Sequence, residues 1–176
     1  MKRICVTGPE SSGKSTLTSA LARHFGTFYV PEAARDFLAQ LGRPYREADL
    51  LDLAREQRRL EIAAGQQSAP GFYFTDTGLE VIKIWAGFRF SRVHPWIAET
   101  LRQFPADLYL LCTPDLPWAP DPLRESPAAE ERETLFQLYS AELTGMGAEW
   151  RTVEGQGEDR LLCAQSLVAD YLGMNF

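Results

Sequence analysis

The sequence predicts an α/β fold in which five parallel strands form a sheet flanked by helices. Short apolar runs alternate along the chain with longer segments of helical periodicity, an order that favours parallel strands joined by right-handed helical crossovers. The run at 107–112 is apolar almost throughout, as expected of a strand that helices cover on both faces. A chain of 176 residues can bury a substantial core, and we expect residues 1–176 to form one domain.

A phosphate-binding motif follows the first expected strand. Residues 8–15 read G-x-x-x-x-G-K-S, between the apolar run Ile4–Val6 and a helix expected from Thr16. This spacing predicts a P-loop NTPase, in which backbone N–H groups surround a polyphosphate, Lys14 binds the β- and γ-phosphates and the Ser15 hydroxyl binds Mg²⁺. A plain Gly- and Ser-rich turn would give no reason for the lysine. We expect ATP and Mg²⁺ to bind at Gly8, Pro9, Glu10, Ser11, Ser12, Gly13, Lys14, Ser15 and Thr16.

Two carboxylates are expected beside this loop. Glu32 opens a helix at 32–41 directly after the second strand, 27–30, and Asp76 follows the third strand, 72–75. Ligands of open α/β sheets bind outside the carboxyl ends of the strands, so Glu32 should emerge at the phosphate edge. Asp76 could hold Mg²⁺ directly or through water, accept a proton from an attacking hydroxyl, or simply cap a helix.

The remaining segments complete the alternation of helices and strands. The pattern predicts helices at 47–64, 79–90, 94–103, 128–143 and 158–172, a linker at 65–71 and a fifth strand at 150–153. Trp85 is either a core residue or a side chain that stacks on a planar heterocycle. The turn with Gly155 and Gln156 lies at the phosphate edge, where its backbone could contact adenine, although a tight turn explains the glycine equally well.

The segment 113–127 has an unusual composition. It carries five prolines in fifteen residues, which excludes a regular helix and predicts a stiff excursion. Long ordered loops in compact domains often act as lids, so we expect a lid here, with Arg124 closing over the transferring phosphate. The alternative is a rigid surface linker with a solvated arginine.

Composition limits the partners of the chain. The net charge of −6 argues against broad binding to nucleic acid or to anionic membranes. The three cysteines, Cys5, Cys112 and Cys163, lack metal-site spacing and fit buried thiols of a reducing compartment. The apolar run before Gly8 is too short for a signal peptide or a membrane span, so we expect a cytoplasmic protein with no membrane insertion. The oligomeric state stays open.

Four segments resemble the ribosylnicotinamide kinase domain of the bacterial NAD-biosynthesis and regulator protein and its stand-alone relatives. The resemblance covers nearly the whole chain and implies ATP- and Mg²⁺-dependent phosphorylation of the 5′-hydroxyl of nicotinamide riboside to nicotinamide mononucleotide. The sequence has no counterpart of the adenylyltransferase and DNA-binding parts of the multidomain members, so neither activity is expected. The segments are Gly8–Ser15, Tyr29–Asp36, Thr75–Thr77 and Leu116–Arg124.

The expected reaction assigns roles to individual residues. Lys14, Glu32, Asp76 and Arg124 form the catalytic group, with Ser15 and Asp76 holding Mg²⁺ and Arg124 also contacting ATP. Either Glu32 or Asp76 is the general base, and we favour Glu32 for contact with the sugar and Asp76 for the metal. The candidates for the acceptor site are Tyr29, Glu32, Arg35, Asp36, Asp76, Trp85, Trp118 and Asp121.

Two other functions remain open. The acceptor could be another nucleoside or a vitamin alcohol, whereas a nucleoside monophosphate is less favoured because few extra arginines are expected near the site. The chain could instead be a P-loop ATPase that acts as a regulatory switch for a protein partner. A carboxylate after the second strand and a proline-rich lid favour transfer to a small molecule over a switch.

Overall fold

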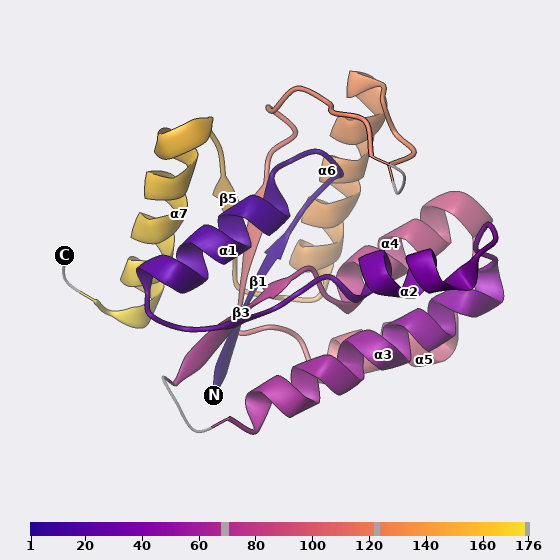
Figure 1. Cartoon of the computed structure of the whole chain (residues 1–176), viewed down its shortest axis with the longest axis horizontal. Helices are drawn as coiled ribbons and strands as arrows, with labels where there is room; N and C mark the ends of the chain where they lie inside the picture. Colours follow the sequence, from indigo (N-terminus) through magenta and orange to yellow (C-terminus); the bar gives the residue numbers. More distant parts are fainter. Residues whose placement is uncertain (68–70, 122–123, 175–176) are drawn as a thin grey trace.

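The computed structural model describes residues 1–67, 71–121 and 124–174, and within these ranges five strands form one sheet (Figure 1). The strands pair in the order β2-β3-β1-β4-β5, and every pair is parallel. This result confirms the predicted α/β fold. The strands are β1 (Lys2–Thr7), β2 (Tyr29–Val30), β3 (Phe72–Asp76), β4 (Leu108–Cys112) and β5 (Trp150–Val153).

The helices lie close to the positions that the sequence predicts. The second strand is shorter than predicted and covers Tyr29–Val30 rather than 27–30. Before it, the Phe28 carbonyl accepts the Phe74 N–H at 3.2 Å, and the Thr27 hydroxyl donates to the carbonyl of Phe72 at 2.7 Å. The helices are α1 (Lys14–His24), α2 (Ala33–Leu41), α3 (Glu47–Gly65), α4 (Leu79–Phe90), α5 (Pro95–Gln103), α6 (Ala129–Gly145) and α7 (Gly157–Leu172).

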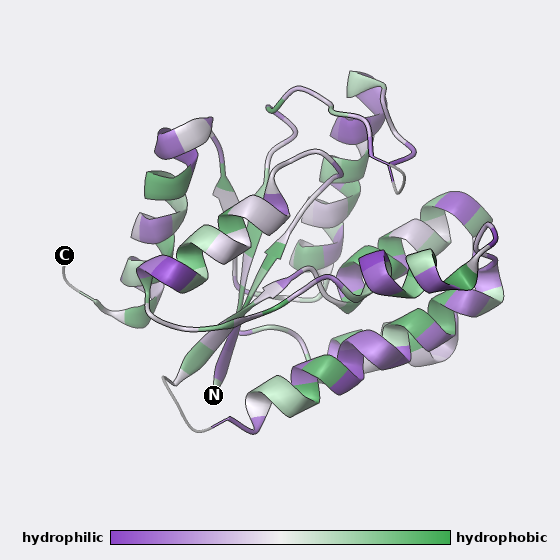
Figure 2. Ribbon diagram, in the orientation of Figure 1, coloured by the Kyte–Doolittle hydropathy of each residue, from purple (hydrophilic) through white to green (hydrophobic). Residues whose placement is uncertain are grey.

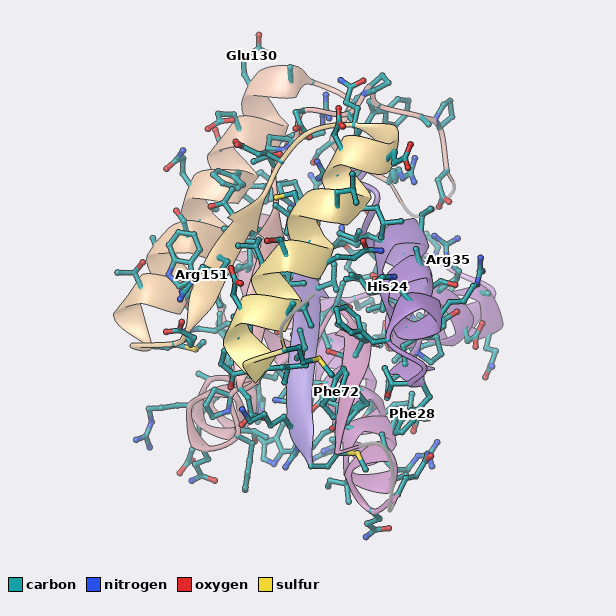
Figure 3. All side chains as sticks on the ribbon, turned by 90° about the vertical axis from the view of Figure 1, so that its left-hand side faces the viewer. His24, Phe28, Arg35, Phe72, Glu130 and Arg151 are labelled. Carbon is teal, nitrogen blue, oxygen red and sulfur yellow. The ribbon has the colours of Figure 1, made fainter. Side chains whose placement is uncertain are left out.

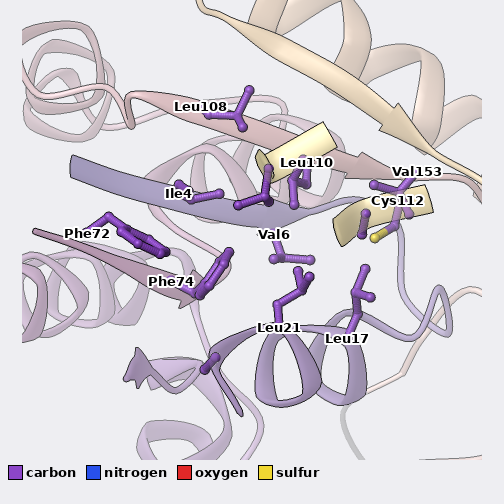
Figure 4. Close-up of a cluster of buried hydrophobic side chains, with 13 residues drawn as sticks. Ile4, Val6, Leu17, Leu21, Phe72, Phe74, Leu108, Leu110, Cys112 and Val153 are labelled. Carbon is purple, nitrogen blue, oxygen red and sulfur yellow. The ribbon is translucent and has the colours of Figure 1, made fainter. Parts of the chain in front are cut away.

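Helices cover both faces of the sheet, and strand alternation decides which side chain meets which layer. On one face, Val6 and Leu110 pack against Leu17 and Leu21 of α1 and against α7 (Figure 4). On the other face, Tyr109 and neighbouring residues pack against α4 and α6. Figure 2 shows the result along the helices, where hydrophilic and hydrophobic residues alternate in bands. None of the helices in the described ranges is long and apolar enough to cross a membrane.

The strand register brings the carboxyl ends of three strands, and the segments that follow them, to one edge of the sheet. Val6 of β1 pairs with Asp76 of β3, and Val30 of β2 pairs with Thr75. The carboxyl ends of β1, β2 and β3 therefore lie side by side. Each strand passes directly into a segment that the sequence assigns to the site: the P-loop after β1, Glu32 after β2 and Asp76 at the end of β3.

Gly8 allows the chain to leave β1 and pass close to β4. Its φ angle is +135°, and a Cβ placed there would lie 2.6 Å from the carbonyl oxygen of Cys112. Only glycine adopts this conformation readily, and only glycine leaves room for that carbonyl. Backbone sterics therefore require a glycine at position 8, in addition to the requirement of the phosphate-binding motif for glycine there.

We predict that Gly8→Ala destabilises the protein more than an alanine at another glycine of positive φ. Gly147→Ala is the matched control, because Gly147 has a φ of +64° and a Cβ added there would meet nothing within 4 Å. The control should lower the free energy of unfolding by about 1 kcal/mol, and Gly8→Ala by about 2–4 kcal/mol, because the collision adds to the strain. Urea denaturation measures both. Equal losses would contradict the steric argument.

Candidate active site

The conformation of the P-loop favours the binding of an anion. Gly13 has a φ of +77° and immediately precedes α1, so the loop ends at the N-terminus of a helix. The Pro9 carbonyl accepts hydrogen bonds from the Ser12 hydroxyl and from the Lys14 ammonium group, both at 2.7 Å. These two hydrogen bonds connect the start of the loop to its end. Backbone N–H groups and positive charge at a helix N-terminus form a favourable site for phosphate.

A cavity of about 690 Å³ extends from the P-loop between α2, α3 and α4. This volume lies within the range of about 300–1,000 Å³ that is usual for small-molecule sites. Polar groups line the end at the loop, and apolar and aromatic side chains line the far end, which we call the apolar chamber. The polar wall includes Gly8, Glu10, Ser11, Gly13, Lys14, Ser15, Thr16, Glu32, Arg35, Asp121 and Arg124; the apolar chamber includes Leu38, Tyr45, Leu50, Leu53, Val81, Ile82, Trp85, Phe90 and Tyr139.

Asp76 lies buried at the carboxyl end of β3, beside the P-loop. Its side chain is almost inaccessible, and its Oδ1 atom has no hydrogen-bond partner among the described residues. Burial raises the pKa of Asp76, while a hydrogen bond from the Ser15 hydroxyl and the charge of Lys14 act in the opposite direction. A buried carboxylate oxygen without a partner next to a hydroxyl is a donor set that fits Mg²⁺, which prefers hard oxygen ligands.

Glu32 stands at the N-cap position of α2, yet its side chain forms no capping hydrogen bond within the described structure. The carboxylate instead lines the cavity. Burial raises the pKa of Glu32, Lys14 lowers it, and Asp76 raises it further. A carboxylate whose pKa is raised toward neutrality is a better proton acceptor than an ordinary surface glutamate.

The 113–127 segment is fastened to the P-loop through Glu10. The Glu10 carboxylate accepts hydrogen bonds from the Trp118 indole at 3.1 Å, from the Glu125 amide at 2.8 Å and from the Ser126 amide at 2.6 Å. Three donors on one carboxylate fix the segment across the loop. Residues Pro122 and Leu123 of this segment lie outside the described residues.

Arg124 reaches the cavity from the same segment. Its guanidinium donates to the Ser11 hydroxyl oxygen at 3.3 Å and to the Ala119 carbonyl. Ser11 in turn donates to the Pro117 carbonyl at 3.2 Å. Arg124 is therefore held beside the loop that would carry the phosphates, which is the position that the sequence pattern required of it.

Several residues that the sequence proposed for the site lie away from the cavity wall. Tyr29 is 39% exposed, and Asp36 is also exposed on α2. Arg35 does line the cavity, but its side chain is 53% exposed and lies at the edge of the molecule, 3.2 Å from Asp121 (Figure 3). Of the proposed residues that the structure describes, those absent from the wall are Pro9, Ser12, Tyr29, Asp36, Asp76, Trp118, Gly155 and Gln156.

The turn with Gly155 and Gln156 is bonded to Asp115. The Gly155 amide donates to the Asp115 carboxylate at 2.8 Å, and the Gln156 side chain donates to the Asp115 carbonyl at 3.1 Å. This turn thus contacts the start of the 113–127 segment on the β5 side of the P-loop. Its proposed contact with adenine stays a prediction.

Arg160 is a residue of the site region that the sequence reasoning missed. It is 4% exposed, and its guanidinium donates to the carbonyls of Ser12 at 2.9 Å, Thr113 at 3.0 Å and Gly155 at 2.8 Å. It also forms a 2.7 Å ion pair with Asp115. One arginine therefore joins the P-loop, the end of β4 and the β5–α7 turn. Its spacing with Ala164 and Val168, four and eight residues later, was an available signal that Arg160 points inward.

The expectation of few extra arginines near the site is wrong. Besides Arg124, the side chains of Arg35, Arg43 and Arg89 line the described cavity. Arg35 and Arg43 come from α2 and the α2–α3 connection that follows it, and Arg89 comes from the end of α4, far from both in the sequence. Carboxylates balance part of this charge, since Arg43 pairs with Asp49 at 2.7 Å and Arg89 with Glu125 at 2.9 Å.

Comparison with known proteins identifies the family. A model of the AAA domain matches residues 3–160, which is most of the chain. The chain belongs to the AAA domain family. Two curated relatives of this AAA domain are the trifunctional NAD biosynthesis/regulator proteins NadR of Salmonella typhimurium LT2, 26% identical, and of Escherichia coli K12, 27% identical. Each match covers 98% of this chain but 43% of the relative, so the chain spans less than half of their length.

Solved structures have the same fold as this AAA domain. NadR in complex with NR matches with a TM-score of 0.82 at 22% identity, covering 99% of this chain and 52% of that chain. NadR in complex with NAD and AMP-PNP also matches at 0.82, with 21% identity, over 99% of this chain and 50% of the other. Thymidylate kinase from Ehrlichia chaffeensis matches with a TM-score of 0.67 at 12% identity, covering 97% of this chain and 98% of that chain. The resemblance that the sequence indicated and the kinase-like P-loop fold are confirmed.

We predict that Arg160→Met lowers the free energy of unfolding by about 2–4 kcal/mol and weakens ATP binding, because it leaves buried carbonyls of the P-loop and of β4 without a donor. Arg151→Met is the control, since Arg151 is an exposed arginine of β5 that forms an ion pair with Glu149. The control should change stability by less than about 0.5 kcal/mol. Urea denaturation and calorimetric titration with ATP test both variants. Equal stability for the two would contradict a structural role for Arg160.

Proposed function

We propose that this protein is an ATP-dependent kinase with a small alcohol acceptor, and that the acceptor is the 5′-hydroxyl of nicotinamide riboside. The observation that carries the proposal is the continuous cavity, which runs from the P-loop past Glu32 into the apolar chamber. A donor and an acceptor bound at its two ends would meet beside Glu32 and Lys14. Holding two reactants in this way can supply much of the barrier reduction for a transfer reaction.

In this proposal, the loop residues 8–15 and Lys14 bind the phosphates of ATP, while Ser15 and Asp76 hold Mg²⁺. When bound, Mg²⁺ would neutralise phosphate charge and orient the γ-phosphate. Lys14 would exchange its bond with the Pro9 carbonyl for phosphate oxygens. Arg124 would exchange its bond with Ser11 for the transferring group.

Glu32 is the proposed general base. It would accept the proton of the acceptor hydroxyl as that oxygen attacks the γ-phosphorus of ATP, the bond to the β-phosphate oxygen breaks and ADP leaves. Lys14 would stabilise the negative charge on the phosphate oxygens during this transfer. Asp76 is the other candidate for this role, and its buried position beside Ser15 favours the metal instead.

The walls of the apolar chamber suit a flat heterocycle. Trp85 is partly buried and lines the cavity together with Tyr45 and Phe90. The pyridinium ring of nicotinamide riboside is a cation, and aromatic faces attract cations. Glu32 adds negative charge to the same space, whereas Asp121 and Glu125 are each paired with an arginine of the wall. The similarity to NadR, one structure of which holds NR, points to the same acceptor.

A phosphorylated acceptor is the second candidate. Arg35, Arg43 and Arg89 line the cavity and could bind the phosphate of a nucleoside monophosphate. Their pairing with Asp121, Asp49 and Glu125 leaves less free positive charge than such an acceptor requires, so we rank it lower.

The test is an acceptor panel with purified protein, ATP and Mg²⁺. Nicotinamide riboside, common nucleosides, vitamin alcohols and nucleoside monophosphates are each supplied, and products are identified by mass. We expect phosphate transfer to nicotinamide riboside, lost in Lys14→Ala. Product from a nucleoside monophosphate alone would support the second candidate. Saturable ATP binding with no product from any acceptor would overturn the kinase proposal and favour a regulatory ATPase.

We further predict that the rate falls as the pH drops through the raised pKa of Glu32, because the base must be deprotonated. This acid limb should lie above the pH range of an ordinary glutamate. Glu32→Gln should lower kcat by about 10²–10⁴-fold and remove the limb, while ATP affinity stays unchanged. Asp76 would instead be the base if Glu32→Gln retained the acid limb and Asp76→Asn lost phosphate transfer while still binding ATP.

A further inference from the structure

Gln57 is a buried polar residue of α3 that the mechanism above does not use. Its side chain is 2% exposed and lies among apolar neighbours that include Leu53 and Ala54. Burying an amide without hydrogen bonds costs free energy, so each of its polar groups needs a partner. The partners of Gln57 explain why an amide occupies this position.

The Gln57 amide joins the two segments that carry the candidate carboxylates. Its Oε1 accepts the backbone N–H of Ala33 at 3.3 Å, next to Glu32. Its Nε2 donates to the carbonyl of Thr77 at 3.4 Å, next to Asp76. One side chain therefore connects the start of α2 to the end of β3.

Gln57 also takes over the capping of α2. Ala33 is the first residue of the helix, so its N–H has no acceptor inside the helix. A residue at the N-cap often supplies an acceptor for such orphan groups, but Glu32 forms no capping bond here. Gln57 therefore supplies an acceptor for the Ala33 N–H from a second helix, while the Glu32 carboxylate lines the cavity.

At its other end, Gln57 holds a strained turn. Thr77 has a φ of +67°, a conformation that β-branched residues rarely adopt. Its N–H donates to the Val6 carbonyl at 3.0 Å, and its carbonyl accepts from Gln57. Such strain persists only where surrounding bonds determine the conformation, and it is common at functional sites.

Glu61 fixes the orientation of the Gln57 amide. The second Nε2 hydrogen is donated to Glu61 Oε1 at 3.2 Å. Glu61 is itself buried and paired with Arg3 and with Arg58. Turning the amide over would set its NH₂ group against the Ala33 N–H and its oxygen against a carboxylate. All three polar functions of the amide are therefore used in one orientation.

We propose that Gln57 is a positioning residue of the site, which sets Glu32 and Asp76 relative to each other by bonding Ala33 and Thr77 at the same time. The proposal rests on the kinase function for its catalytic consequence, but not for its geometry. Residues that orient catalytic groups in this way typically change activity by about 10–100-fold when they are removed.

The experiment replaces the amide by an apolar chain of similar length, Gln57→Met. We expect kcat with the acceptor to fall about 10–100-fold, while KM for ATP changes less than about 2-fold, because the P-loop is untouched. Exchange of the Ala33 amide hydrogen, followed by NMR in the ligand-free protein, should become at least about 10-fold faster. If Gln57→Met does not fold, Gln57→Asn serves, because its amide is one carbon too short to reach both partners.

Two controls separate positioning from stability. Gln137→Met removes an amide that bonds Glu133 four residues away on α6, the same spacing as Gln57 and Glu61, and should change neither readout. Ile97→Ala removes packing in the same apolar cluster and should lower the melting temperature without lowering kcat. A Gln57→Met protein that loses stability but keeps kcat, as Ile97→Ala does, would overturn the proposal.

The exchange measurement needs no acceptor, so the two hypotheses fail separately. A wild-type protein that phosphorylates nothing would overturn the kinase function, while faster exchange at Ala33 in Gln57→Met would still support positioning by Gln57. Unchanged exchange at Ala33 would overturn the positioning role whatever the activity.

Discussion

The sharp departure of the chain from β1 at Gly8 is the constraint on which the rest of the structure depends. The loop passes so close to the Cys112 carbonyl of β4 that a side chain cannot fit, and this approach points the backbone of residues 8–15 across the end of the sheet. Parallel pairing then brings the ends of β2 and β3 to the same edge. The P-loop, Glu32 and Asp76 therefore meet at one edge of the sheet as a consequence of one turn and one strand order.

Buried polar side chains hold this edge of the sheet in place, although burying them costs desolvation free energy that apolar side chains would not. Arg160 fastens the P-loop to β4 and to the β5–α7 turn, and Gln57 fastens α2 to β3. Each lies behind the cavity rather than in it. A buried polar side chain without hydrogen bonds is costly, and both side chains bond several backbone groups, so these contacts tolerate few alternative arrangements. Their effect is to fix the geometry of the residues in front of them.

Burial and neighbouring charges together set the pKa values of the carboxyl groups at this edge of the sheet. Burial disfavours the charged forms of Glu32 and Asp76 and raises the pKa of each, while Lys14 partly offsets that effect. The arginines of the wall are mostly paired with carboxylates, including Glu125 of the 113–127 segment. Glu10 connects the same segment to the P-loop.

The sequence by itself determined the parallel sheet, the P-loop and the positions of Glu32 and Asp76, because periodicity and motif spacing are local properties of the chain. Arg124, which the sequence analysis expected to close over a phosphate, lies within hydrogen-bond distance of Ser11 of the loop. Only the tertiary structure decided that Tyr29 faces away, that Arg43 and Arg89 join the cavity, and that Arg160 and Gln57 support the site. Arg160 meets Ser12 across 148 residues of sequence, and no local pattern encodes such a contact. It arises when helices pack on the sheet and buried donors must find acceptors.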